Sequence, residues 1–474
     1  MRLTGKEKFA YGLGAVGKDM VYMLSASYVL YYYQDILGVN AVAMGVILLI
    51  ARIFDAFNDP IMGVVVAKTK TRWGKFRPWL LIGTITNAVI LYLLFAAPPQ
   101  LTGSGLVVYA AVFYILWGVT YTMMDIPYWS MVPAFTESGR ERENLSALAR
   151  SCAGVGSALI SIVAIIAVQA LGTMMEGADA SAVAIERTGF KWLGLIVAVL
   201  FIVLTLVTCI CIKEKSSVDM ETASVKDMFR SLIHNDQAMT MVIAIVLVNT
   251  AVYITNNLVI YFFKYDIANL SWQSDYTLFT TFGGGMQILA MMAFFPLLRK
   301  AWSTMKIFYI SIASAVAGYI MLLVMALSGT RNIYVLFIPA FFIMSAVGIL
   351  NVIVTIFLAN TVDYGEWKNK RRDESVIFSM QTFVVKLASG IAALVASICL
   401  SIFSIGGAST DEVVTEVVRA SDSSVFGLRM TMTIIPVIVL LIALVVFRKK
   451  YCLNDEKLNE ITAELANRKN NQSV

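Results

Sequence analysis

Histidine is almost absent from this sequence, and cysteine is sparse. The only histidine among 474 residues is His234, which lies in a polar stretch, so histidine catalysis or a histidine proton relay within a membrane is excluded. The five cysteines are scattered, without the paired or CxxC spacing of metal sites and disulfide frameworks. HExxH and GxSxG motifs are missing as well. We therefore expect no enzyme activity and no cofactor.

Charged residues are also scarce. They make up 14% of the chain and apolar residues 59%, whereas soluble domains have about 25% and 45–50%. A chain of this length cannot bury so much apolar surface in one core, so the excess must face lipid. The net charge of +6 fits basic loops beside anionic headgroups better than nucleic-acid binding. The N-terminus lacks the apolar core of a signal peptide, so we expect the first membrane helix to direct insertion.

Apolar segments of about 20 residues or more recur along the whole chain. They predict an all-α membrane protein with twelve transmembrane helices. The predicted helices cover residues 9–37, 40–67, 79–98, 106–133, 146–171, 191–212, 237–263, 273–297, 306–328, 333–361, 376–403 and 425–447.

The longest polar break lies in the middle of the chain. We expect an N-terminal six-helix bundle at 1–212, a central cytoplasmic loop at 213–236, a C-terminal bundle at 237–447 and a cytoplasmic tail at 448–474. Lysine and arginine concentrate in alternate loops, such as 68–78 with five, which places both termini in the cytoplasm. Two similar halves are typical of the major facilitator fold, whose substrate site lies between the halves near the bilayer midplane.

Ionisable residues inside the predicted helices are the candidate functional residues. Each costs at least about 2.5–3.5 kcal/mol on insertion scales, so it needs a partner or a wet cavity. One interpretation is a salt-bridge network that fixes helix packing. Buried ion pairs stabilise weakly, however, so we favour a functional cavity. The candidate residues are four cations and four carboxylates: Lys18, Arg52, Arg150, Lys386, Asp19, Asp55, Asp59 and Asp125.

The segment ARIFDAFNDPIMG indicates a cation site. Asp55 and Asp59 are four residues apart on one helix face, where like charges repel. A cation between them removes the repulsion, and Asn58 adds a neutral oxygen. Such oxygens suit Na⁺ or Li⁺, and the same carboxylates could take H⁺. Alternatively, one aspartate is protonated and idle, or pairs with Arg52.

The predicted helix at 106–133 indicates a sugar site. Tyr121, Asp125 and Trp129 follow one stripe of this helix. A carboxylate beside an indole suits a sugar, because the ring covers the apolar C–H face while the carboxylate accepts hydroxyl hydrogen bonds. The alternative is a set of core aromatics with an interfacial tryptophan.

Further polar groups accompany these two motifs. Arg150 and the Lys18–Asp19 pair supply additional donors and acceptors. In the predicted helix at 376–403, Thr382 and Lys386 place polar groups near one face. Lys386 could neutralise the carboxylates of the second helix from the other half, or could serve charge compensation alone.

Four segments carry a family resemblance. RIFDAFNDPIMG, TRWGKFRPW, YTMMDIPYWSMVP and VDYGEWK resemble the glycoside–pentoside–hexuronide:cation symporters of the major facilitator superfamily, and among these the members that transport melibiose. The likeness covers most of the chain and is strongest in its first half. It implies a galactosyl site of Lys18, Asp19, Tyr121, Asp125, Trp129, Arg150, Thr382 and Lys386, and a cation site of Asp55, Asn58, Asp59 and Thr122.

The resemblance implies a secondary active transporter of the bacterial inner membrane. It would couple a galactoside such as melibiose to Na⁺, Li⁺ or H⁺ by alternating access, and the coupling would be thermodynamically reciprocal. Another glycoside, a pentoside or a hexuronide remains an alternative, as does a lipid carrier of the same fold. Two positions depart from the melibiose-transporting pattern: Asn351 replaces a tryptophan and Asn360 replaces an aspartate.

Overall fold

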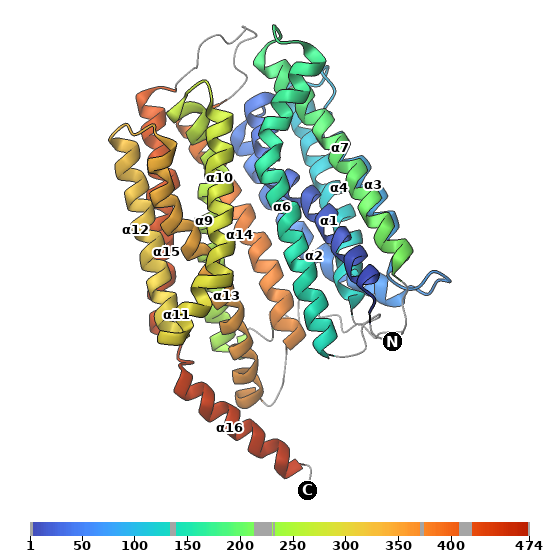
Figure 1. The fold of residues 1–474 in the computed structure, drawn as a ribbon, viewed down its shortest axis with the longest axis vertical. Helices are drawn as coiled ribbons and strands as arrows, with labels where there is room; N and C mark the ends of the chain where they lie inside the picture. Colours follow the sequence, from blue (N-terminus) through green and yellow to red (C-terminus); the bar gives the residue numbers. More distant parts are fainter. Residues whose placement is uncertain are drawn as a thin grey trace. The chain divides into compact units, whose positions relative to one another are not determined.

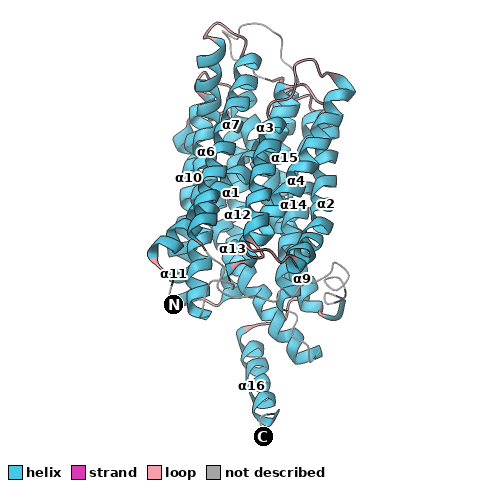
Figure 2. Ribbon diagram, turned by 90° about the vertical axis from the view of Figure 1, so that its right-hand side faces the viewer, coloured by secondary structure: helices cyan, strands magenta, loops and turns pink. Residues whose placement is uncertain are grey.

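The computed structural model is helical throughout the part of the chain that it describes, which contains no strand (Figure 2). This confirms the predicted all-α class. At some of the described positions, Thr382 among them, only the backbone is described. The described residues are 3–132, 139–212, 230, 233–369, 374–406 and 420–472.

Contacts divide the chain into two compact units. The first comprises Met1–Thr222, Phe263–Leu278 and Leu400–Ala420. The second comprises Ala223–Phe262, Phe279–Cys399 and Ser421–Val474. Two short segments from the second half of the sequence therefore belong to the first unit.

The helices of the first half of the sequence make up most of the first unit (Figure 1). They are α1 Gly5–Tyr31, η1 Tyr32–Ile36, α2 Ala41–Lys68, α3 Arg77–Leu94, α4 Gly103–Ser130, α6 Gly139–Glu176 and α7 Ala182–Cys211. The remaining elements are α9 Asp236–Tyr261, η2 Phe262–Ile267, α10 Trp272–Leu289, η3 Ala290–Phe294, α11 Phe295–Ala301, α12 Thr304–Leu327, α13 Ile333–Asn369, α14 Glu374–Ile402, α15 Asp422–Lys450 and α16 Asp455–Gln472.

The number of membrane-length segments agrees with the sequence. Among the described residues, 11 segments are long and apolar enough to cross a membrane. Helix α1 is not one of them, although its 27 residues are long enough, and it contains the polar pair Lys18 and Asp19. With α1 the set matches the twelve predicted segments. The polar tail forms the helix α16.

Close helix packing in the first unit places the charged helices next to one another. Helix α1 packs against α6 and α7, while α4 packs against α2 and α3. Two glycines allow these approaches. A Cβ on Gly83 would lie 2.7 Å from the backbone nitrogen of Met124, and a Cβ on Gly156 would lie 2.3 Å from the carbonyl oxygen of Val16.

Three π-helical turns depart from the sequence prediction of continuous α-helices. One extends α1 at Tyr32–Ile36, one extends α9 at Phe262–Ile267, and one interrupts the predicted 273–297 segment at Ala290–Phe294. Hydrophobic periodicity does not reveal such turns, because one inserted residue shifts the pattern only locally. They are frequent at functional sites.

Candidate sugar and cation site

A buried ammonium group organises the first candidate cluster. Lys18 Nζ lies 2.9 Å from Asp125 Oδ1 and 3.3 Å from Asp19 Oδ1. It also donates a hydrogen bond of 3.3 Å to the hydroxyl of Tyr121. The Lys18 side chain is 5% exposed, whereas the carboxylate side chains are 18% and 23% exposed. The lysine thus holds two carboxylates together while both keep an open side.

An indole ring lies beside this ion-paired group. Trp129 Nε1 donates a hydrogen bond of 3.2 Å to Asp125 Oδ1. The ring centroid of Trp129 is 5.1 Å from Lys18 Nζ and 5.0 Å from Arg150 Cζ. Because the carboxylate and the indole are tied together by this hydrogen bond, the ring is fixed next to hydrogen-bonding groups, as the sugar hypothesis requires.

The structure brings together six of the eight predicted sugar residues, from α1, α4 and α6 of the first unit. Helix α14 carries the other two in the second unit. Lys386 is half-buried there. The side chain of Thr382 lies outside the described residues.

The predicted cation carboxylates lie on α2 and differ in their partners. Asp55 Oδ2 is 3.4 Å from Arg52 Nη1, and both side chains are buried. The Asp55–Arg52 pairing that the sequence left open is therefore present. Asp59 Oδ1 accepts a hydrogen bond of 2.9 Å from Thr122 Oγ1 on α4. This contact joins two of the four predicted cation ligands across the α2–α4 packing.

Two further features make room for polar atoms beside these carboxylates. A Cβ on Gly118 would lie 2.5 Å from Asp55 Oδ1, so a larger residue at position 118 would displace this carboxylate. Asn58 Nδ2 is buried and has no hydrogen-bond partner among the described residues. Within those residues, no group of three or more histidine, cysteine or acidic side chains could hold a metal ion. A cation here would need the neutral oxygens of Asn58 and Thr122 as well.

The aromatic surroundings of Arg52 were missed by the sequence analysis. Its guanidinium carbon lies 5.7 Å from the ring centroid of Tyr22, 5.8 Å from that of Tyr114 and 5.9 Å from that of Trp117. Cation–π contacts stabilise a buried guanidinium. The helical spacing of Tyr114, Trp117 and Tyr121 is a signal that could have revealed one wall of this cage.

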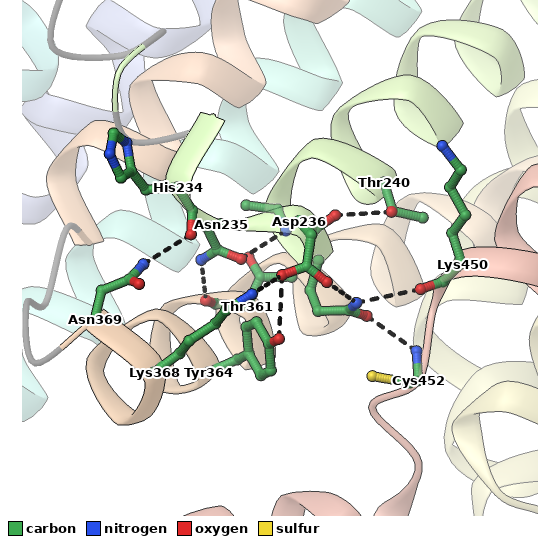
Figure 3. Close-up of polar contacts among 12 residues, drawn as sticks. His234, Asn235, Asp236, Thr240, Thr361, Tyr364, Lys368, Asn369, Lys450 and Cys452 are labelled. Carbon is green, nitrogen blue, oxygen red and sulfur yellow. Dashed lines mark hydrogen bonds and ion pairs between the residues drawn. The ribbon is translucent and has the colours of Figure 1, made fainter.

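A second polar cluster, in the second unit, lies at helix ends (Figure 3). Asp236, the first residue of α9, accepts hydrogen bonds from Lys368 Nζ and Tyr364 Oη near the end of α13. Gln237 Nε2 donates to the carbonyl oxygen of Lys450, and its Oε1 accepts from the Cys452 amide. These contacts tie the ends of α9, α13 and α15 together.

Comparison with known proteins identifies the family. A family model described as MFS/sugar transport protein matches residues 10–455. The chain belongs to this family. This family includes the glycoside–pentoside–hexuronide symporters, which confirms the resemblance to them seen in the sequence. The closer likeness to members that transport melibiose stays a prediction. The family consists of membrane transporters and not enzymes.

Several curated relatives are named for sugars. The chain is 30% identical to an isoprimeverose transporter of Lactiplantibacillus pentosus, over 83% of this chain and 80% of that protein. It is 27% identical to a lactose permease of Lactobacillus delbrueckii subsp. bulgaricus, over 97% of this chain and 72% of that protein. A raffinose carrier protein of Pediococcus pentosaceus is 26% identical, with 97% and 71% covered.

Solved structures agree in fold. A bacterial homologue of the human lysosomal transporter Spinster superposes with a TM-score of 0.65 at 11% identity, covering 96% of this chain and 97% of that one. The nucleoside transporter NupG gives 0.60 at 12% identity, with 93% and 99% covered. This sugar-transport family member is therefore a multi-pass membrane protein of the major facilitator fold that carries out secondary active sugar transport.

Proposed function

We propose that this protein is a symporter that takes up a galactoside, such as melibiose, together with Na⁺, Li⁺ or H⁺. It would act in the bacterial plasma membrane with both termini in the cytoplasm. The observation that carries the proposal is the Lys18–Asp19–Asp125 group with the Trp129 ring attached to it. Paired carboxylates, an ammonium and an indole form a chemical match to a sugar ring.

Each of these groups would make a different kind of contact with the sugar. The carboxylates of Asp19 and Asp125 accept hydrogen bonds from two or more hydroxyls on the open sides that they retain. Lys18 pairs with both carboxylates and can also donate a hydrogen bond to a ring or hydroxyl oxygen of the sugar. Trp129 covers an apolar C–H face, with Arg150 on the same ring. The proposal assigns Thr382 and Lys386 of the second unit to the same sugar.

The coupling cation would bind between α2 and α4. Asp55 and Asp59 supply charge, and Asn58 and Thr122 supply neutral oxygens. To accept a cation, the Thr122 hydroxyl turns its hydrogen away from Asp59 and presents its oxygen. Neutralising the carboxylates removes a cost of placing charge in a low-dielectric region and so favours the sugar-bound state. By linkage, the sugar favours the cation equally.

A second candidate substrate is a xylosyl disaccharide. The observation that favours it is the relative named for isoprimeverose, a disaccharide of xylose and glucose. Lactose and raffinose, which name two other relatives, each contain a galactosyl group. The acidic pair and indole suit both classes, but a xylosyl ring lacks the hydroxymethyl group of a galactosyl ring.

Purified protein in proteoliposomes tests the proposal. Uptake of radiolabelled melibiose, lactose, raffinose, isoprimeverose and a glucuronide is measured with an inward gradient of Na⁺, Li⁺ or H⁺, and without one. We expect accumulation of a galactoside that depends on one of these cation gradients. Accumulation of isoprimeverose alone would favour the xylosyl candidate. Uptake of none of the sugars under any gradient would refute the proposal.

A further inference from the structure

A second buried charge cluster lies in the first unit, away from the candidate sugar site. Asp35 Oδ2, on η1, is 2.6 Å from Lys264 Nζ, on η2. Glu186 Oε2, near the start of α7, is 3.7 Å from the same ammonium. We call these three residues the Asp35 latch. They come from three elements that are far apart in the sequence, and the sequence analysis assigned a role to none of them.

Hydroxyl and amide groups complete the latch. Tyr265 Oη donates a hydrogen bond of 2.6 Å to Asp35 Oδ1. Tyr31 Oη accepts one of 2.7 Å from Lys264 and donates one of 2.8 Å to Glu186 Oε2. Beside the latch, Gln34 Nε2 donates to the carbonyl oxygen of Ile405 at 2.9 Å. Residues 34 and 35 therefore hold two segments of the second half of the sequence.

The latch is buried and acidic. The Asp35 side chain is fully buried, and those of Glu186 and Lys264 are 11% and 21% exposed. One ammonium faces two carboxylates in the described part of the chain. A small cavity with room for about one water molecule, lined by Glu186, Tyr31 and Trp272 among others, lies next to it. Water in this cavity would therefore lie next to an ion-paired cluster that is otherwise packed away from solvent.

The position of the latch along the chain points to a role in conformational change. Helix α9 belongs to the second unit, but the segment Phe263–Leu278 that follows it belongs to the first. The latch fastens this segment to η1 and α7. Both η1 and η2 are π-helical turns, which are common at functional sites. Within the first unit, the latch lies at the ends of α1 and α7 that are opposite to the basic 68–78 loop, because α2 separates that loop from η1.

We propose that Asp35, Glu186 and Lys264 form a gate that is shut in this structure and that opens to admit sugar from the side opposite the 68–78 loop. This inference rests on the proposed transport by alternating access and names residues that control it. The gate can open at small cost, since Coulomb attraction in a buried ion pair is largely offset by desolvation. Opening returns all three charges to water.

The gate contains two carboxylates and one ammonium, so removing the ammonium should affect its shut state and its open state differently. Replacing Lys264 with methionine leaves the carboxylates of Asp35 and Glu186 buried together without the ammonium. That penalty exists only while the gate is shut, because both carboxylates are hydrated when it is open. Lys264→Met should therefore shift the equilibrium toward the open gate. Lys264→Arg keeps the charge and should shift it much less.

The test is the reactivity of a single reporter cysteine. In the full chain, the five native cysteines are replaced by serine and Ile36, which is 3% exposed beside Asp35, is replaced by cysteine. Labelling by a water-soluble maleimide is timed in purified protein in detergent, where both faces of the protein are accessible, without sugar or added cation. We expect Lys264→Met to raise the labelling rate at least about ten-fold, the ratio expected when the gate's equilibrium shifts by about 1.4 kcal/mol.

Matched controls separate gating from loss of structure. Ile212→Cys places a reporter at a fully buried position at the far end of α7. Lys457→Met removes an exposed lysine that also contacts a carboxylate, that of Glu460 at 2.8 Å. We expect Ile212→Cys to stay unreactive in Lys264→Met. We expect Lys457→Met to leave the labelling rate of Ile36→Cys unchanged.

Two outcomes would overturn the gate. One is an unchanged labelling rate of Ile36→Cys in Lys264→Met, and the other is an equal rise at Ile36→Cys and Ile212→Cys, which indicates general loosening. Because labelling is measured without sugar, it is independent of the uptake panel. A protein that labels as expected but transports none of the sugars would refute the proposed function and not the latch.

Discussion

The ion pairs of the two units differ in depth. In the first unit, Lys18–Asp125, Arg52–Asp55 and Lys264–Asp35 each have a member that is at most 5% exposed. In the second unit, both members of Arg299–Asp455, Lys368–Asp236 and Lys457–Glu460 are at least 41% exposed. The same residue types are therefore used in two physically different ways.

The contribution of an ion pair to stability depends on how deeply its side chains are buried. An exposed pair contributes about 0–1 kcal/mol, because water screens its attraction and competes for its hydrogen bonds. A buried pair gains little net stability, yet removing one partner costs about 3–5 kcal/mol because a charge is left unpaired. Buried charges cost free energy to maintain, which favours a functional role for them. The exposed Asp236–Lys368 contact requires no more than a structural role, tying helix ends together.

The largest effect that this comparison predicts is at Asp125. Asp125→Asn removes the charge that faces Lys18 and weakens the hydrogen bonds offered to sugar hydroxyls. We expect galactoside affinity to fall at least about 100-fold, or about 2.7 kcal/mol, in an equilibrium binding assay. Na⁺ binding should remain measurable, because the predicted cation ligands lie elsewhere. Near-wild-type galactoside affinity in this variant would remove Asp125 from the sugar site.

A smaller and more selective effect is expected at Asp59. Asp59→Cys breaks the carboxylate pair and loses the hydrogen bond from Thr122, while the sugar cluster on α1 and α4 keeps its groups. Sugar should still bind and exchange down its gradient, but the roughly ten-fold or smaller enhancement of affinity by Na⁺ should be lost. Asp55→Cys should behave similarly, with greater loss because Arg52 is left unpaired. Uphill, Na⁺-enhanced uptake by Asp59→Cys would show that the cation binds elsewhere.

The smallest effect is expected in the second unit. Lys368→Met removes an exposed partner of Asp236, so the free energy of unfolding should fall by less than about 1 kcal/mol. Sugar affinity and cation stimulation should stay within about two-fold of the wild type, as thermal unfolding and binding assays in detergent would measure. A loss of binding as large as that of Asp125→Asn would mean that exposure does not separate functional from structural pairs in this protein.

Much of the fold and part of the site could be predicted from sequence. Apolar segment length predicted the membrane helices, because only helices satisfy their own backbone hydrogen bonds in lipid. The ends were less accurate: α7 begins at Ala182 and not at 191, and α13 ends at Asn369 and not at 361. Helical spacing placed Tyr121, Asp125 and Trp129 on one stripe, and the hydrogen bond from Trp129 to Asp125 follows from that spacing. Local rules suffice here because the residues are close together on one helix.

The sequence by itself determined the class of protein, since few charges and recurring apolar segments require a membrane, and family motifs on α2 and α4 indicate sugar transport. Only the tertiary structure decided how charges from distant segments pair. Lys264 and Asp35 are 229 residues apart, and no periodicity relates them. The cage of Tyr22, Tyr114 and Trp117 around Arg52 likewise joins three helices. Pairing over such separations depends on helix packing, which hydrophobic patterns alone do not specify.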